Sequence, residues 1–75
     1  MKWSIEITDT FGGDANYSWV KRFDIETDVN ATSGDILKEI EVASGFGGFT
    51  EAYDDGDSIR FDHETDCVCI FATCY

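Results

Sequence analysis

The sequence contains no proline, and it holds only five lysine and arginine residues against sixteen aspartate and glutamate residues. The resulting formal charge of −11 repels phosphates, so direct binding to DNA or RNA is not expected. Self-repulsion at this charge density destabilises a compact state, and folding alone does not require it. The charge therefore serves either solubility or a positively charged partner, such as a protein surface that normally holds nucleic acid.

Cysteine is scarce as well. The chain has three, Cys67, Cys69 and Cys74, and an odd number clustered at one end is a poor basis for a disulfide framework. A reducing cytoplasm fits this usage better, and an unpaired thiol leaves a monomer or a weak homodimer open. Because no basic start is followed by a long apolar run, we predict neither a signal peptide nor a membrane span.

Residue types that carry catalysis or hold metals are also few. There is one histidine, no glycine-rich phosphate loop before a helix, and no nucleophile beside a base, so we expect no catalytic residue and no cofactor. Gly56 follows Asp54 and Asp55, but Asp62 stands six positions later, which fails the EF-hand register. His63 and the cysteines lack zinc-knuckle spacing, so we predict no metal site. A small metal-dependent enzyme remains the weakest alternative.

What the chain does have is an apolar content of 43% with 15% aromatics, enough for the core of one domain spanning residues 1–75. Residues 1–8 and 17–26 alternate between apolar and polar, which predicts two strands joined as a hairpin across the glycine-containing segment 11–16. We expect one face of this hairpin to point into the core, with Lys21 near its rim. The inward residues would be Trp3, Ile5, Ile7, Tyr17, Trp19, Phe23 and Ile25.

A helix is predicted next. Thr32 or Ser33 can cap it, and Thr32 with Asp35 has the form of a capping box. Gly45 is a natural C-terminal stop. An apolar stripe follows helical spacing through Ile36, Leu37, Ile40 and Ala43.

Three further strands are expected at residues 50–53, 58–62 and 67–75. The last of them is apolar on both faces, which is typical of a central strand. Together these elements predict an α+β fold in ββαβββ order: an antiparallel sheet of four or five strands with one helix packed on one face.

The most distinctive stretch runs from Glu51 to Asp66. It carries seven of the sixteen acids against a single cation, Arg60, with Tyr53 as a possible aromatic anchor beside them. Outward residues on a strand recur roughly every 6.6 Å, which resembles the separation of neighbouring phosphates on one nucleic-acid strand. A solubilising surface is the alternative interpretation. The main candidates for partner binding are Glu51, Asp54, Asp55, Asp57, Asp62, Glu64 and Asp66; Asp24, Glu26 and Asp28 form a second group.

The segment Asp9-Thr10-Phe11-Gly12-Gly13-Asp14-Ala15-Asn16-Tyr17-Ser18-Trp19-Val20 resembles the start of small proteins encoded by bacteriophages and other mobile elements. Small acidic proteins from that setting include anti-CRISPR and anti-restriction inhibitors that occupy DNA-binding surfaces. The resemblance implies this genomic setting, and the chain looks like these inhibitors in its size, charge and cytosolic character. We therefore predict a non-catalytic anti-CRISPR protein in the host bacterial cytosol, which presents a DNA-mimicking acidic surface, chosen from charge and spacing, to the basic DNA-binding surface of a CRISPR effector. The alternative is a phage accessory protein, structural or regulatory, whose charge serves solubility.

Overall fold

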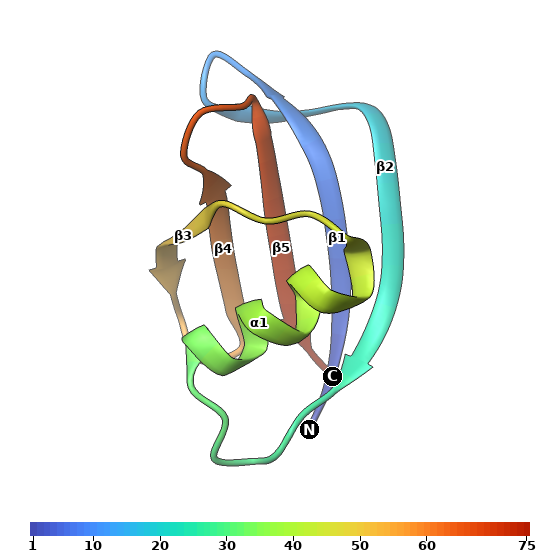
Figure 1. The fold of residues 1–75 in the computed structure, drawn as a ribbon, viewed down its shortest axis with the longest axis vertical. Coiled ribbons are helices and arrows are strands. Elements are labelled where there is room, and N and C mark those ends of the chain that lie inside the picture. Colours follow the sequence, from blue (N-terminus) through green and yellow to red (C-terminus); the bar gives the residue numbers. More distant parts are fainter.

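The computed structural model describes all 75 residues, as five strands and one helix (Figure 1). The elements are β1 (Lys2–Phe11), β2 (Asp14–Glu26), α1 (Ser33–Ser44), β3 (Phe49–Asp54), β4 (Ser58–His63) and β5 (Val68–Cys74). The sheet is antiparallel throughout, with the strand order β2-β1-β5-β4-β3, and the helix crosses one of its faces. This confirms the predicted α+β fold in ββαβββ order.

Helix α1 begins and ends as its sequence predicts. The Thr32 hydroxyl accepts a hydrogen bond from the Asp35 amide (3.2 Å), and the Asp35 carboxylate accepts one from the Thr32 amide (3.0 Å), which completes the capping box. At the other end, Gly45 adopts a φ of 79° and its amide donates to the Glu41 carbonyl. The helix is too short and too polar to span a lipid bilayer.

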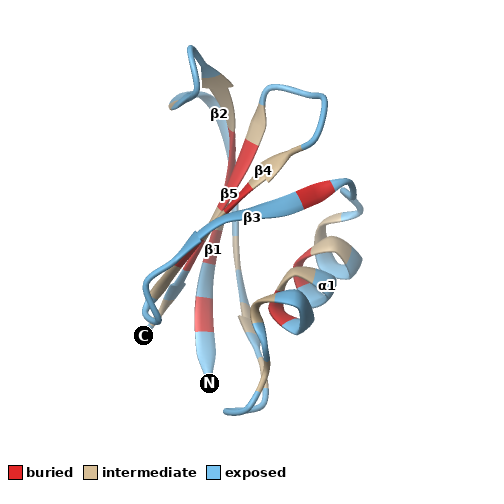
Figure 2. Cartoon of the chain, turned by 90° about the vertical axis from the view of Figure 1, so that its left-hand side faces the viewer, coloured by how far each residue is buried: buried red, intermediate tan, exposed pale blue.

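The core lies between α1 and the face of the sheet that α1 covers (Figure 2). Two helix residues, Ile36 and Ile40, are buried there, whereas Ala43 is exposed, so the apolar stripe is narrower than predicted. Strand residues with the same alternation complete the core: Trp3, Ile5, Ile7, Phe49, Ile59, Phe61, Ile70 and Ala72. No helix or strand covers the opposite face, which we call the open face (Figure 2).

Strand β5 lies in the middle of the sheet, between β1 and β4, as its apolar residues predict. Ile70 and Ala72 pack in the core, and Cys69 on the open face is also fully buried. The strand starts one residue later than expected, because Cys67 remains exposed in the preceding turn. Burial raises the pKa of the Cys69 thiol, which keeps it protonated.

The β1–β2 hairpin differs from its prediction in two ways. Its strands extend to a two-residue turn at Gly12 and Gly13, whose φ values of 63° and 88° suit a hairpin. Between the pairs Thr8–Val20 and Thr10–Ala15, β1 contributes Asp9 alone, whereas β2 contributes residues 16–19. The extra residues bend β2 at Tyr17, whose φ is 54°. The Tyr17 side chain consequently lies on the open face, and its predicted inward position is wrong.

Candidate partner-binding surface

Two groups of acids that are far apart in the sequence lie at the same end of the sheet. Strand β2 ends there, and the β3–β4 turn lies at the same end, beside both chain termini (Figure 1). Cross-strand pairs connect the two groups directly: Asp24 of β2 pairs with Ser4, Ser4 pairs with Thr73, and Thr73 pairs with Ser58 at the start of β4. We call this the acidic end. Its acids are Asp24, Glu26, Asp28, Asp54, Asp55 and Asp57, all of them exposed and all predicted as candidates.

Hydrogen bonds that the backbone amides donate hold both flanks of the acidic end. In the β3–β4 turn, the Asp55 amide donates to the Ser58 carbonyl (2.9 Å), and the Asp54 carboxylate accepts from the Gly56 amide (2.8 Å). The Cys74 amide ties this turn to β5 by donating to the Asp57 carbonyl (2.8 Å). On the other flank, the Asp28 carboxylate accepts from the Asn30 amide (3.0 Å). The carboxylates are therefore presented from ordered turns.

Little positive charge compensates the acidic end. The two salt bridges of the protein, Glu6–Arg22 and Asp62–Arg60, lie on the open face. Both arginines stand in the next row of cross-strand pairs, two residues from the row of Asp24 and Ser58, and each is paired with an acid outside this end. Lys2 of β1 lies at the acidic end, where it is the cross-strand partner of Glu26. Burial and a hydrogen bond to Asp24 raise the pKa of the Tyr75 hydroxyl, so this neighbour stays neutral.

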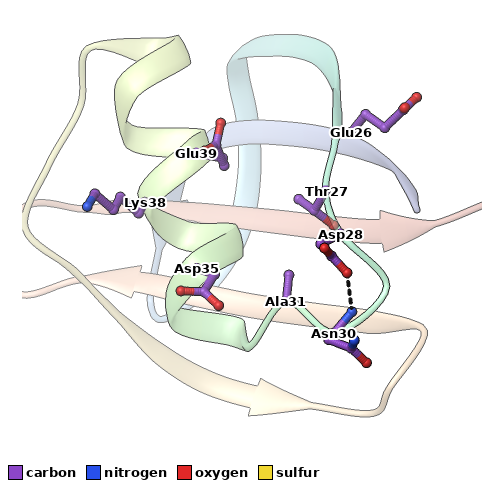
Figure 3. A pocket seen from close by; sticks show the side chains of 8 residues that line it. All are labelled: Glu26, Thr27, Asp28, Asn30, Ala31, Asp35, Lys38 and Glu39. Carbon is purple, nitrogen blue, oxygen red and sulfur yellow. Dashed lines mark hydrogen bonds between the residues drawn. The ribbon is translucent and has the colours of Figure 1, made fainter.

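An open hollow of about 600 Å³ extends the acidic end toward the helix (Figure 3). It lies between the first turns of α1 and the chain that leaves β2. Four carboxylates line it, from Glu26, Asp28, Asp35 and Glu39, with Lys38 as the one cation. Hydrogen bonds from the backbone and the hydroxyl of Thr32 lower the pKa of Asp35, which keeps this carboxylate ionised. No three His, Cys, Asp or Glu side chains gather in a way that could hold a metal ion, here or elsewhere.

The remaining predicted acids lie elsewhere, so the stretch from Glu51 to Asp66 does not form one surface. Glu51 lies on the β3 edge, and β4 then separates the acidic end from the turn with Glu64 and Asp66 by roughly 20 Å, at about 3.3 Å per residue. In that turn His63 accepts hydrogen bonds from the Thr65 and Asp66 amides, and its ring packs edge-on against Phe49.

Asp62 and Tyr53 point to the open face. Asp62 is paired with Arg60 (2.9 Å), whose guanidinium lies over the Phe71 ring and donates to the Gly13 carbonyl (2.8 Å). Tyr53 lies opposite Arg60 and is 42% exposed. This face carries three of the five cations, so it is close to neutral. Its charged residues are Lys2, Arg22 and Arg60 with Glu6, Asp24, Glu26 and Asp62.

Glu6, Tyr17 and Arg22 form a polar cluster on the open face that was not predicted from the sequence. The Tyr17 hydroxyl donates to Glu6, and Arg22 pairs with the same carboxylate at 2.9 Å. The Tyr17 bond, with a smaller contribution from Arg22, lowers the pKa of Glu6, and it raises the pKa of Tyr17. Only the bend in β2 brings Tyr17 to this face, and the alternation of the sequence gives no signal for that bend.

Asp9 organises the bend itself. Its carboxylate accepts hydrogen bonds from the Ser18 hydroxyl (2.6 Å), the Ser18 amide (2.9 Å) and the Asn16 amide group (2.9 Å). The bonds from Ser18 and Asn16 hold the pKa of Asp9 far below its usual range. The role of these residues in the structure is to hold the bend of the hairpin.

No protein-family model, curated protein or solved structure gives a significant match to this chain.

Proposed function

We infer that this protein is a non-catalytic inhibitor that occupies a basic, nucleic-acid-holding surface of another protein. In its most specific form, it is an anti-CRISPR protein that acts in the bacterial cytosol and blocks target-DNA binding by a CRISPR effector. One observation carries this proposal: two acidic groups, distant in sequence, converge on one end of a firmly hydrogen-bonded sheet, where acids outnumber the nearby cations and the two nearest arginines are paired with acids outside that end.

The dimensions of the acidic end support mimicry of a nucleic-acid backbone. Asp24 and Glu26 alternate along β2, about 6.6 Å apart. Three strand spacings of about 4.8 Å separate β2 from β4, so the two acidic flanks lie about 14 Å apart. The major groove of DNA, at about 12 Å, separates its two phosphate rows on the same scale. A groove lined with Lys and Arg could therefore meet both flanks at once.

Carboxylates that are carried by ordered backbone give such an inhibitor two advantages. Complementary fields accelerate association with a basic groove. Ordered turns also lose little conformational freedom on binding, which favours affinity. Six further acids, at the opposite end of the sheet, on α1 and on the β3 edge, would repel nucleic acid that competes for the groove: Asp9, Asp14, Glu41, Glu51, Glu64 and Asp66.

The proposal is tested by inhibition of DNA binding. Purified guide-loaded CRISPR effectors of several types are mixed with labelled target duplex, and the bound fraction is measured by anisotropy at moderate salt. We expect the protein to displace the duplex from at least one effector. A variant with Glu26→Lys, Asp55→Lys and Asp57→Lys should lose at least about tenfold in inhibition. None of these three side chains holds a turn through a hydrogen bond.

A matched control carries Asp14→Lys, Glu64→Lys and Asp66→Lys. It changes the net charge by the same amount but leaves the acidic end intact, so its inhibition should stay within about threefold of the parent. If both triple variants lose inhibition equally, net charge rather than the acidic end is responsible. If no effector is inhibited and immobilised protein captures no DNA-displaceable partner, the charge serves solubility and the accessory-protein alternative holds.

A further inference from the structure

Strand β2 forms a long edge of the sheet with nothing beyond it (Figure 1). Met1 and Thr27 exchange two backbone hydrogen bonds, of 2.6 and 2.8 Å. Because antiparallel ladders alternate, Ile25, Phe23 and Lys21 direct their backbone groups toward β1. The residues between them direct theirs to solvent: Val20, Arg22, Asp24 and Glu26.

The other edge, β3, is protected against pairing. It has only six residues and an irregularity between Glu51 and Tyr53. The straight part of β2 has neither a bulge nor a proline. Exposed edges of this kind template the addition of another strand. The protein thus has one long, regular edge and one short, interrupted edge; the charges on the long edge restrict which strand can pair with it.

A second copy of β2 is the strand that best fits this edge. When two identical strands pair in antiparallel orientation, one residue lies at the two-fold axis and faces the same residue of the second copy. The charges of the neighbouring side chains determine which residue occupies that position. An axis at Arg22 places two Arg22 side chains opposite each other, and an axis at Asp24 does the same with two aspartates. An axis at Phe23 instead places Arg22 opposite Asp24 of the second copy, twice.

The same register suits the side chains that surround it. Phe23 meets Phe23 of the second copy on the side that α1 covers, and Val20 lies opposite Glu26. Arg22 binds Glu6 through Nε and is 63% exposed, so its terminal nitrogens are free for Asp24 of the second copy. We propose that the protein forms a two-fold dimer by antiparallel β2–β2 pairing centred on Phe23, which joins two sheets into one.

Salt gives the first test, and it needs neither a partner nor the proposed inhibitory function. Two chains at −11 repel each other, and salt screens this repulsion. Sedimentation equilibrium should show a dimer that strengthens at least about tenfold between 0.05 and 0.5 M NaCl. A protein that stays monomeric at millimolar concentration in 0.5 M NaCl overturns the proposal, as does association beyond a dimer.

Charge exchange tests the register. Asp24→Arg should weaken the dimer at least about tenfold, because it places arginine opposite Arg22. Arg22→Asp should do the same, and the double variant Arg22→Asp/Asp24→Arg should restore the dimer to within about threefold. Glu51→Arg and Lys38→Asp change the net charge equally and leave β2 untouched, so they should not weaken it. The register is overturned if the single variants lose the dimer and the double variant does not regain it, although the circular dichroism spectrum of the double variant shows that it is folded.

Disulfide trapping supplies a measurement that does not depend on charge. In a Cys67→Ser background, Phe23→Cys would bring two thiol-bearing residues to Cα atoms about 4.5 Å apart, within disulfide range. Oxidation should give a covalent dimer with Phe23→Cys and much less with Arg22→Cys or Asp24→Cys. Equal trapping at all three positions overturns the register.

Discussion

Truncation of Ile40 to alanine should remove much of the stability of the fold. Ile40 is fully buried, and with Ile36 it is one of only two buried residues of α1. The change removes three carbons at about 0.8 kcal/mol each, roughly 2.4 kcal/mol. The cavity left under the helix adds about 1–2 kcal/mol. Because a chain of this size has roughly 4–11 kcal/mol of total stability, Ile40→Ala should remove between about a third and nearly all of it.

Urea denaturation followed by circular dichroism measures this loss. Urea is preferable to guanidinium chloride, which as a salt would also screen the self-repulsion of a −11 chain. With an m-value of about 1 kcal/mol per M, the midpoint should fall by about 3–4 M. Val42→Ala on the same helix is the control: Val42 is 77% exposed, so the change should stay within about 0.5 kcal/mol. If Ile40→Ala costs no more than Val42→Ala, the helix does not pack on the sheet as described.

Three other perturbations give distinct results. Thr32→Ala should cost about 1 kcal/mol and lower the Tm by about 4–8 °C, whereas Thr32→Ser should retain the cap; equal melting of the two variants would rule out the capping role. The depressed pKa of Asp9 stabilises the fold above the unfolded pKa of about 3.9, and this stabilisation disappears as the pH falls toward the folded pKa. Asp9→Asn should therefore flatten the loss of stability in urea titrations between pH 5 and 2; a pH profile identical to that of the parent protein would contradict this assignment. Raising NaCl from 0.02 to 0.5 M should raise the Tm, and a Tm that falls would show that self-repulsion does not limit stability.

Alternation and capping patterns in the sequence were enough to predict most of this fold. The capping box at Thr32, the stop at Gly45 and the central place of β5 are confirmed, because each depends on local chemistry or on burial of both strand faces. The bend at Tyr17 was not predictable. It depends on the hydrogen bonds that Asp9 accepts from Asn16 and Ser18 across the hairpin. A pattern of apolar and polar residues contains no information about such polar contacts.

The candidate surface was predictable only in part. The sequence marks its acids, but it presents the segment from Glu51 to Asp66 as one unit. In the structure a hairpin strand divides that segment, and strand order then joins its first half to the acids at the end of β2. Strand order is a property of the whole sheet, so the grouping of Asp24 with Asp57 appears only after folding.

The most direct test of the acidic end is an amide NMR footprint. The protein, labelled with ¹⁵N, is titrated with the DNA-binding partner that it inhibits, and the amides whose signals shift or broaden are mapped on the sheet. We predict that the affected amides cluster at residues 24–28 and 54–57 and recover when duplex DNA is added. Affected amides confined to residues 64–67 and the β1–β2 turn would contradict the account.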